Sequence, residues 1–222
     1  MKFKGIIFDL DGTLINSLED IADSMNRVLS RKNFPIHDSE CYKYFIGNGI
    51  KNMVIEALPE KHRHEEVVTN CFNLMMEDYR NNCLVKTRLY DGIPDLLNIL
   101  EKRNIKIAVF SNKADNLTKM IVKELLNNWC FDTIIGASSD IPRKPDPTGA
   151  CLISKALGIC PDNMIYVGDS DVDMNTANSA GMFAIGVMWG YRTQHELLAN
   201  GAKMLLKHPL DLIDFLEKDN EV

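Results

Sequence analysis

The sequence predicts an α/β protein in which a doubly wound parallel sheet carries an inserted all-helical domain. Two observations lead to this prediction. Short apolar runs alternate with helical patterns over most of the chain, whereas residues 17–85 show helical patterns and no convincing strand. We therefore expect an α/β core formed by residues 1–16 and 86–222, with a helical insert at residues 17–85. The length of 222 residues suits one large domain with an inserted piece.

The predicted strands are short apolar runs, a composition typical of strands buried on both faces of a parallel sheet. In chain order they cover residues 5–8, 105–110, 133–135, 164–167 and 184–188. The helices predicted between them carry apolar residues at spacings of three and four, and cover residues 94–100, 116–126, 148–157 and 173–180. Sheets of this kind bind ligands beyond the carboxyl ends of their strands, so polar residues directly after each strand are candidates for a functional site.

The first helix of the insert follows Ser17, which forms a capping-box pattern with Asp20. Its apolar residues recur at helical spacing and form one stripe. That stripe consists of Leu18, Ile21, Ala22, Met25, Val28 and Leu29. Further helices are expected over residues 38–45, after Gly49, and over about 65–79.

The composition excludes several classes of protein. A hydrophobic fraction of 45% and a charged fraction of 25% are ordinary for a globular chain and exclude wholesale disorder. The net charge of -6 argues against a nucleic-acid partner or an anionic membrane, either of which would need a basic face. The longest apolar stretch, residues 183–189, is too short to span a bilayer. No obligate protein partner is evident.

The six cysteines indicate a reducing environment. They form no CxxC pair, and the N-terminal residues do not have the pattern of a signal peptide. We expect reduced, mostly buried thiols in a cytoplasmic protein.

A pair of carboxylates stands directly after the first predicted strand. Residues 9–14 read DLDGTL, and the side chains of Asp9 and Asp11 point to the same side of an extended chain. Gly12 permits a sharp turn that a Cβ would obstruct. A strand-end turn with two solvated aspartates would explain a bare pair, but the full pattern is too rare for chance to explain it well.

Three further polar groups follow later strands. Ser111 and Asn112 could donate hydrogen bonds to phosphoryl oxygens, although a turn or a helix cap would explain them equally well. Lys144 lies in a loop stiffened by the two prolines that follow it, with a solvated surface lysine as the alternative. Asp169 and Asp173 indicate a Mg²⁺ site that a substrate would complete.

These segments, in this order, resemble the haloacid dehalogenase superfamily, specifically its phosphatases, and the resemblance covers the whole chain. The motifs are Asp9-x-Asp11-Gly12-Thr13-Leu14, Ser111-Asn112, Lys144-Pro145-Asp146-Pro147 and Gly168-Asp169-x-x-x-Asp173. The resemblance implies that the helical insert is the cap domain of that superfamily. It also implies Mg²⁺-dependent hydrolysis of a small phosphorylated metabolite through an aspartyl-phosphate intermediate.

The resemblance implies a role for each motif residue. Asp9 would be the nucleophile, and Asp11 the general acid and base. The phosphate contacts would be Ser111, Asn112 and Lys144. The metal ligands would be Asp9, Asp169 and the backbone carbonyl of Asp11. Asp173 would support the metal's waters or Lys144. The four aspartates would then converge on a site with one lysine, and this excess of negative charge calls for a divalent cation before an anionic phosphate can enter.

Weaker features concern the substrate. Gly47, Asn48 and Gly49 precede a helix, so their backbone amides could meet an anionic group, and a plain loop is the alternative. Residues 189–192, which read WGYR, are similar to the phosphoglycolate phosphatases of the superfamily, which implies 2-phosphoglycolate as the substrate. A pyrophosphatase, a β-phosphoglucomutase-like phosphomutase and a non-catalytic phosphate-binding regulator are the alternatives. Arg192 is expected to be an ordinary surface cation.

Overall fold

The computed structural model describes residues 2–218 of the chain. The chain divides into two compact units, each of which is described by itself. The first comprises Met1–Ile15 and Leu89–Val222, and is called the sheet unit. The second comprises Asn16–Arg88, which includes the whole of the expected insert, and is called the helical unit.

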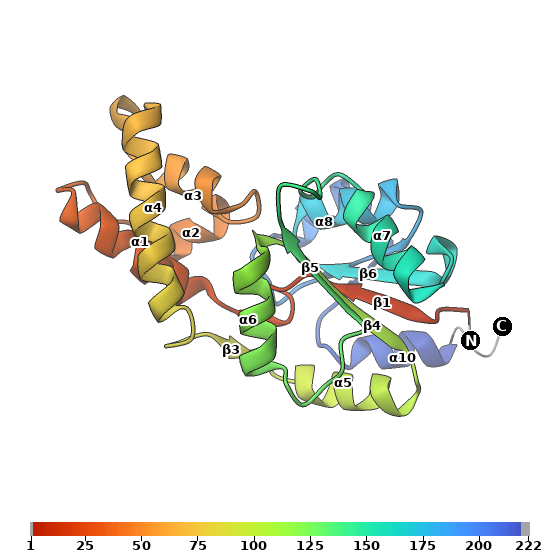
Figure 1. The fold of residues 1–222 in the computed structure, drawn as a ribbon. Helices are drawn as coiled ribbons and strands as arrows, with labels where there is room; N and C mark the ends of the chain where they lie inside the picture. Colours follow the sequence, from red (N-terminus) through yellow and green to blue (C-terminus); the bar gives the residue numbers. More distant parts are fainter. Residues whose placement is uncertain (1, 219–222) are drawn as a thin grey trace. The chain divides into compact units, whose positions relative to one another are not determined.

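A six-stranded sheet with the strand order β5-β4-β1-β6-β7-β8 forms the centre of the sheet unit (Figure 1). The strands are β1 (Gly5–Phe8), β4 (Lys106–Ala114), β5 (Thr133–Ala137), β6 (Met164–Gly168), β7 (Phe183–Val187) and β8 (Met204–Leu206). All neighbouring strands pair in parallel, and Ile7 of β1 lies opposite both Ala108 and Tyr166. Every residue of β1 is buried, which explains its unbroken apolar run. The predicted α/β fold with a parallel sheet is confirmed.

Helices cover both faces of this sheet. They are α5 (Ile93–Lys102), α6 (Asp115–Leu125), α7 (Thr148–Leu157), α8 (Asp171–Ser179), α9 (Gln194–Ala199) and α10 (Asp211–Lys218), with a short 3-10 helix, η2 (Pro161–Asn163). Figure 1 shows α5 and α10 on one face and α7 and α8 on the other. The buried side chains of Phe110 and Tyr166 belong to the core that packs under α7 and α8. Among residues 2–218, no helix is both long and apolar enough to cross a membrane.

The C-terminal elements were not predicted from the sequence. Strand β8 has three residues, and helices α9 and α10 have six and eight. The six residues of α9 span less than two turns, too few for a helical period to stand out, whereas α10 does carry apolar residues at helical spacing, at Leu212, Ile213 and Leu216. Strand β4 is also longer than predicted, because it continues through Ser111, Asn112 and Lys113 to Ala114. All three of these polar residues are buried, so the strand itself carries them into the interior.

The helical unit contains α1 (Leu18–Arg31), α2 (Ser39–Phe45), α3 (Ile50–Ala57), the 3-10 helix η1 (Glu60–His62) and α4 (Glu65–Asn82). Every residue of the predicted apolar stripe on α1 is buried, and α1 packs against α4 and α2. The two-residue strands β2 (Ile15–Asn16) and β3 (Arg88–Leu89) pair where the chain passes between the units. The helical character predicted for this segment is therefore observed.

The capping box predicted for α1 does not form. Ser17 occupies the N-cap position, but its side chain makes no capping hydrogen bond. The Asp20 carboxylate instead accepts hydrogen bonds from the backbone N–H groups of Lys86 and Thr87, at 2.8–3.0 Å, and from the Thr87 hydroxyl at 2.8 Å. The buried carboxylate thus ties α1 to the segment that follows α4. These distant donors satisfy Asp20 better than the local backbone could, because they supply several hydrogen bonds to one buried charge.

The cysteines are all free thiols, as predicted. The prediction that most are buried is wrong: Cys71 and Cys83 are buried, whereas the other four are exposed. The reason is their placement, because each lies on a helix or in a loop and none lies in the buried strands of the sheet. The cytoplasmic location stays a prediction.

Candidate active site

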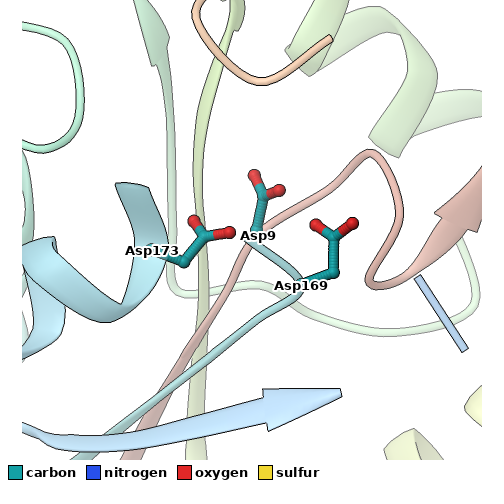
Figure 2. A group of neighbouring side chains, drawn as sticks. All are labelled: Asp9, Asp169 and Asp173. Atoms are coloured by element: carbon teal, nitrogen blue, oxygen red, sulfur yellow. The ribbon is translucent and has the colours of Figure 1, made fainter. Parts of the chain in front are cut away.

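Three carboxylates gather where neighbouring strands of the sheet end. Asp9 directly follows β1, Asp169 directly follows the adjacent β6, and Asp173 lies in the first turn of α8. Parallel strands end at the same edge of a sheet, so β1 and β6 deliver Asp9 and Asp169 to one place. Figure 2 shows Asp9 between the other two, and one carboxylate oxygen from each lies within 4.8 Å of the others. All three residues are buried.

The two carboxylate oxygens of Asp173 accept hydrogen bonds from different residues. One of its oxygens, Oδ2, accepts hydrogen bonds from the backbone N–H of Ser170 at 3.1 Å and from the Ser170 hydroxyl at 2.5 Å. With Ser170 it forms the capping box that begins α8, which fixes the side chain in place. The other oxygen, Oδ1, accepts a hydrogen bond from Lys144 at 2.6 Å. Asp173 therefore orients a lysine as well as capping a helix.

Lys144 is the buried cation of the cluster, with a side chain that is only 2% exposed. Its Nζ bridges Asp173 and Asp9, with a distance of 2.7 Å to Asp9 Oδ1. The side chain of Asn112 fixes the main chain of Lys144 from both directions: Nδ2 donates to Lys144 O at 3.0 Å, and Oδ1 accepts from Lys144 N at 2.8 Å. Asn112 therefore holds the loop that carries Lys144 against the end of β4.

A second lysine reaches the site, which corrects the expectation of a single one. Lys113, near the end of β4, donates to both carboxylate oxygens of Asp11, at 2.6 and 2.8 Å. Its side chain is 3% exposed and that of Asp11 is 12% exposed. The only signal in the sequence was the position of Lys113 directly after Ser111 and Asn112.

The other predicted residues of the sheet unit lie as follows. Ser111 is 2% exposed, and its Oγ accepts a hydrogen bond from the backbone N–H of Lys113 at 3.2 Å. A hydroxyl that accepts one hydrogen bond can still donate its own hydrogen to a ligand.

In the helical unit, Gly47, Asn48 and Gly49 form the loop between α2 and α3, and both glycines have positive φ. Their part in recognising a substrate stays a prediction.

Asp169 lies in a cradle of two glycines. Gly12 has a φ of 87°, and a Cβ on it would lie 2.3 Å from Asp169 Oδ2. A Cβ on Gly190 would lie 2.2 Å from Asp169 Cβ and 2.6 Å from the backbone oxygen of Gly12. The backbone N–H of Tyr191 then donates to Asp169 Oδ2 at 2.7 Å. The loop that contains Gly190 thus sets the direction of the Asp169 carboxylate.

The rest of this loop is anchored to the same site. Trp189 Nε1 donates to the backbone oxygen of Thr13 at 3.0 Å, which joins the loop to the turn after β1. Arg192 is not the surface cation that the sequence indicated, because its side chain is only 8% exposed and pairs with Glu196 at 3.1 Å. Residues 189–192 therefore act as part of the wall around Asp169.

We predict that Gly190→Ala destabilises the fold by displacing this loop. The new methyl group would meet the backbone of Gly12 and the rigid base of Asp169, so we expect a loss of about 3 kcal/mol, at the upper end for an overpacked site. Gly158→Ala is the control: nothing lies within 4 Å of its Cβ position, and its φ of 67° alone should cost about 1 kcal/mol. Urea unfolding of both variants measures the difference in the free energy of unfolding. Equal losses of stability in the two variants would contradict the close packing of Gly190 against Asp169 and Gly12.

The burial of the cluster changes how its groups ionise. Burial raises the pKa of Asp9 to about 7, an effect that the charge of Lys144 opposes and that of Asp173 reinforces. Burial, together with Asp173 and Asp9, holds the pKa of Asp169 well above its ordinary value. For Lys144 burial favours the neutral form, but Asp173 and Asp9 outweigh it and hold its pKa well above the ordinary value. The lysine thus stays charged, while the carboxylates need more positive charge to ionise fully.

The donor set fits a small divalent cation that prefers oxygen ligands. Asp9, Asp169 and Asp173 offer carboxylate oxygens close together, but both oxygens of Asp173 already accept hydrogen bonds from Lys144 and Ser170. Asp9 and Asp169 are therefore the better ligands. Four carboxylates and two ammonium groups leave two negative charges in the site, which one divalent cation would balance.

The comparison with known families now identifies the class of protein. The model of the haloacid dehalogenase-like hydrolase family matches residues 6–187, a span that includes the aspartates and lysines of the site and ends before residues 189–192. The chain therefore belongs to this family, and its predicted membership is confirmed.

Individual relatives narrow the class of protein further. The chain is 31% identical over 212 residues to "Phosphoglycolate phosphatase" of Aquifex aeolicus (strain VF5), with 96% of each chain covered. It is 29% identical over 218 residues to the phosphoglycolate phosphatase of Chromobacterium violaceum, again with 96% of each covered. A crystal structure from Lactobacillus delbrueckii subsp. bulgaricus, named as a candidate phosphoglycolate phosphatase, has a TM-score of 0.90 at 29% identity and covers 96% of this chain and 97% of its own. The resemblance to phosphoglycolate phosphatases is thus confirmed.

Proposed function

We propose that this protein is a Mg²⁺-dependent phosphatase that hydrolyses small phosphate monoesters, with 2-phosphoglycolate as the leading substrate. The observation that carries the proposal is the pairing of Asp9 with Lys144. A buried carboxylate at the end of β1 has a lysine on one oxygen and a second carboxylate, Asp169, beside it. This is the arrangement that an anionic nucleophile needs when it attacks an anionic phosphate. The names of the relatives support the choice of substrate.

In the first step, an oxygen of Asp9 attacks phosphorus, and the bond from phosphorus to the leaving-group oxygen breaks. Asp11 gives its proton to that oxygen, so the leaving group departs as an alcohol. Lys144 neutralises part of the charge that would otherwise repel the phosphate from Asp9. Ser111 and Asn112 donate hydrogen bonds to the phosphoryl oxygens. The product on the enzyme is an aspartyl phosphate.

In the second step, a water molecule attacks the phosphorus of the aspartyl phosphate. Asp11, now a carboxylate, accepts a proton from that water, and the bond from phosphorus to Asp9 breaks. Inorganic phosphate leaves, and Asp9 is regenerated as a carboxylate.

Asp9, Asp169 and the backbone carbonyl of Asp11 would hold the Mg²⁺ ion, with Asp173 behind Lys144. When bound, the ion supplies positive charge that lowers the repulsion between the nucleophile and the phosphate. The helical unit would serve as the cap domain, and Gly47, Asn48 and Gly49 would contact the substrate. The expected partner is a small phosphorylated metabolite.

A screen of phosphate release at fixed Mg²⁺ tests the proposal. The substrates are 2-phosphoglycolate, pyrophosphate, a hexose phosphate, a nucleotide and p-nitrophenyl phosphate. The proposed function requires Mg²⁺-dependent release, fastest from 2-phosphoglycolate. Fastest release from pyrophosphate would favour a pyrophosphatase, and conversion of a sugar phosphate to its isomer would favour a phosphomutase. If no ester released phosphate, a non-catalytic phosphate-binding regulator would be the remaining alternative.

We predict that the metal-free protein becomes less stable as pH rises and that Mg²⁺ reverses this loss. Because burial raises the pKa of Asp9 to about 7, the folded state binds more protons than the unfolded state between about pH 4 and pH 7. The free energy of unfolding should therefore fall over that window. Mg²⁺ binds the deprotonated carboxylates, so its stabilising effect should be larger at pH 8 than at pH 5.

Thermal unfolding in EDTA and in saturating Mg²⁺, at pH 5 and pH 8, measures both effects. Asp9→Asn is the matched variant, since it removes the main titrating group and should flatten the pH dependence. A stability in EDTA that increases from pH 5 to pH 8, or a Mg²⁺ effect of equal size at both pH values, would contradict the prediction.

A further inference from the structure

The proposed chemistry leaves one buried group of the site without a role of its own, the ammonium of Lys113. This side chain is 3% exposed and makes two short hydrogen bonds to Asp11. Its main chain is held on both sides: the backbone N–H donates to Ser111 Oγ at 3.2 Å, and the backbone oxygen accepts from Thr118 Oγ1 at 3.1 Å. A lysine fixed in this way is a built part of the site rather than a mobile surface charge.

The two lysines of the site lie on different carboxylates. Lys144 contacts Asp9, the group that would attack phosphorus, and therefore faces the phosphoryl end of a substrate. Lys113 contacts Asp11, which must come within hydrogen-bonding distance of the leaving-group oxygen to exchange a proton with it. Through this contact with Asp11, Lys113 would lie beside the first atoms of the leaving group.

A buried ammonium at that place distinguishes between leaving groups. A leaving group with a carboxylate next to the ester-bearing carbon can share the ammonium with Asp11 or take it over. A neutral leaving group offers Lys113 no charged partner. The ligand that Lys113 already holds in this structure is a carboxylate, bound through both oxygens, which favours a carboxylate over other acidic groups.

We propose that Lys113 is a specificity-determining residue that binds the carboxylate of a short 2-phospho acid through its ammonium. This inference rests on the proposed phosphatase function, since it is the general acid role of Asp11 that places the leaving group. It assigns the choice of substrate in part to the end of β4 in the sheet unit, whereas the substrate contacts predicted from the sequence, Gly47, Asn48 and Gly49, all lie in the helical unit.

The test compares two esters that differ only in the acidic group. In 2-hydroxyethyl phosphate a hydroxymethyl group replaces the carboxylate of 2-phosphoglycolate. For Lys113→Met we expect kcat/KM to fall on 2-phosphoglycolate by roughly 10- to 100-fold more than on 2-hydroxyethyl phosphate, the range of one charge-assisted hydrogen bond. Lys119→Met, which removes an exposed lysine paired with Asp115 on α6, is the control and should change neither value.

Two outcomes would overturn the inference while the proposed function stands. Equal losses on the two esters would show that Lys113 only positions Asp11. Wild-type protein that hydrolyses both esters equally well would show that no group in the site selects the carboxylate. If Lys113→Met does not fold, Lys113→Gln, which can still donate to Asp11 but has no charge, is measured against the same expectations. No release from any ester by the wild type would overturn the proposed function itself, and this inference with it.

Discussion

Replacing Asp9 by asparagine is expected to abolish turnover, with a loss of roughly 10⁴- to 10⁶-fold in kcat, the size seen when an enzyme loses its nucleophile. Asparagine has almost the shape of aspartate, but its amide cannot form the aspartyl phosphate. The measurement is phosphate release from p-nitrophenyl phosphate and from 2-phosphoglycolate at saturating Mg²⁺.

Stability separates this effect from damage to the fold. Asp9 is a buried carboxylate whose ionisation is unfavourable, so the metal-free Asp9→Asn protein should be at least as stable as the wild type at pH 8. Lys144 retains its ion pair with Asp173 in this variant. Asp95→Asn, an exposed position on α5, is the control for the loss of one carboxylate elsewhere. Normal turnover by Asp9→Asn would refute the proposed mechanism.

The second large effect is expected for Lys144→Met. The variant leaves the carboxylates of Asp9 and Asp173 buried without their shared cation, and breaking such a buried pair costs about 3–5 kcal/mol. Activity should fall by about 10³-fold or more, because one preorganised group that stabilises the reacting charge accounts for about 10²- to 10³-fold and the nucleophile also loses its orientation.

The pH dependence of this variant tells the two effects apart. At pH 5 Asp9 can take up a proton, so part of the stability loss should disappear, whereas at pH 8 the loss should be largest. Phosphate release should stay low at both pH values. Removing Asp9 as well, in Asp9→Asn with Lys144→Met, should recover part of the stability at pH 8. A stability loss that does not change with pH would contradict the assignment of Lys144 as the partner of both carboxylates. Lys155→Met, an exposed lysine on α7, serves as the control.

The strands that carry the candidate site could be predicted because their residues are buried on both faces. β1 and β6 are continuous apolar runs, and the aspartates that end them stand out by contrast. Ligands bind at the carboxyl ends of parallel strands, and this rule places Asp9 and Asp169 together on the strength of the sequence pattern alone. The place of Lys144 in the site was harder to predict, since no strand directly precedes this residue. Only the resemblance of its motif to the superfamily indicated that it belongs to the site.

A local sequence pattern predicts the wrong hydrogen bond where a residue distant in the sequence is a better partner. Ser17 and Asp20 have the spacing of a capping box, but the Asp20 carboxylate binds the backbone of Lys86 and Thr87 instead. The same spacing at Ser170 and Asp173 does form a capping box. Capping contributes only about 1 kcal/mol, so several hydrogen bonds to a buried carboxylate outweigh it. The sequence alone shows the spacing and does not show the competitor.

Periodicity and spacing within a few residues are enough to predict the fold class, the helical character of residues 17–85 and the groups of polar residues at the ends of strands. Which charges meet depends on the tertiary structure. It pairs Lys113 with Asp11 across 102 positions, and Lys144 with Asp9 across 135, through the order of strands in the sheet. It also brings Gly190 against Asp169. Such pairs depend on how the crossovers return the chain to neighbouring strands, and that geometry leaves no local trace in the sequence.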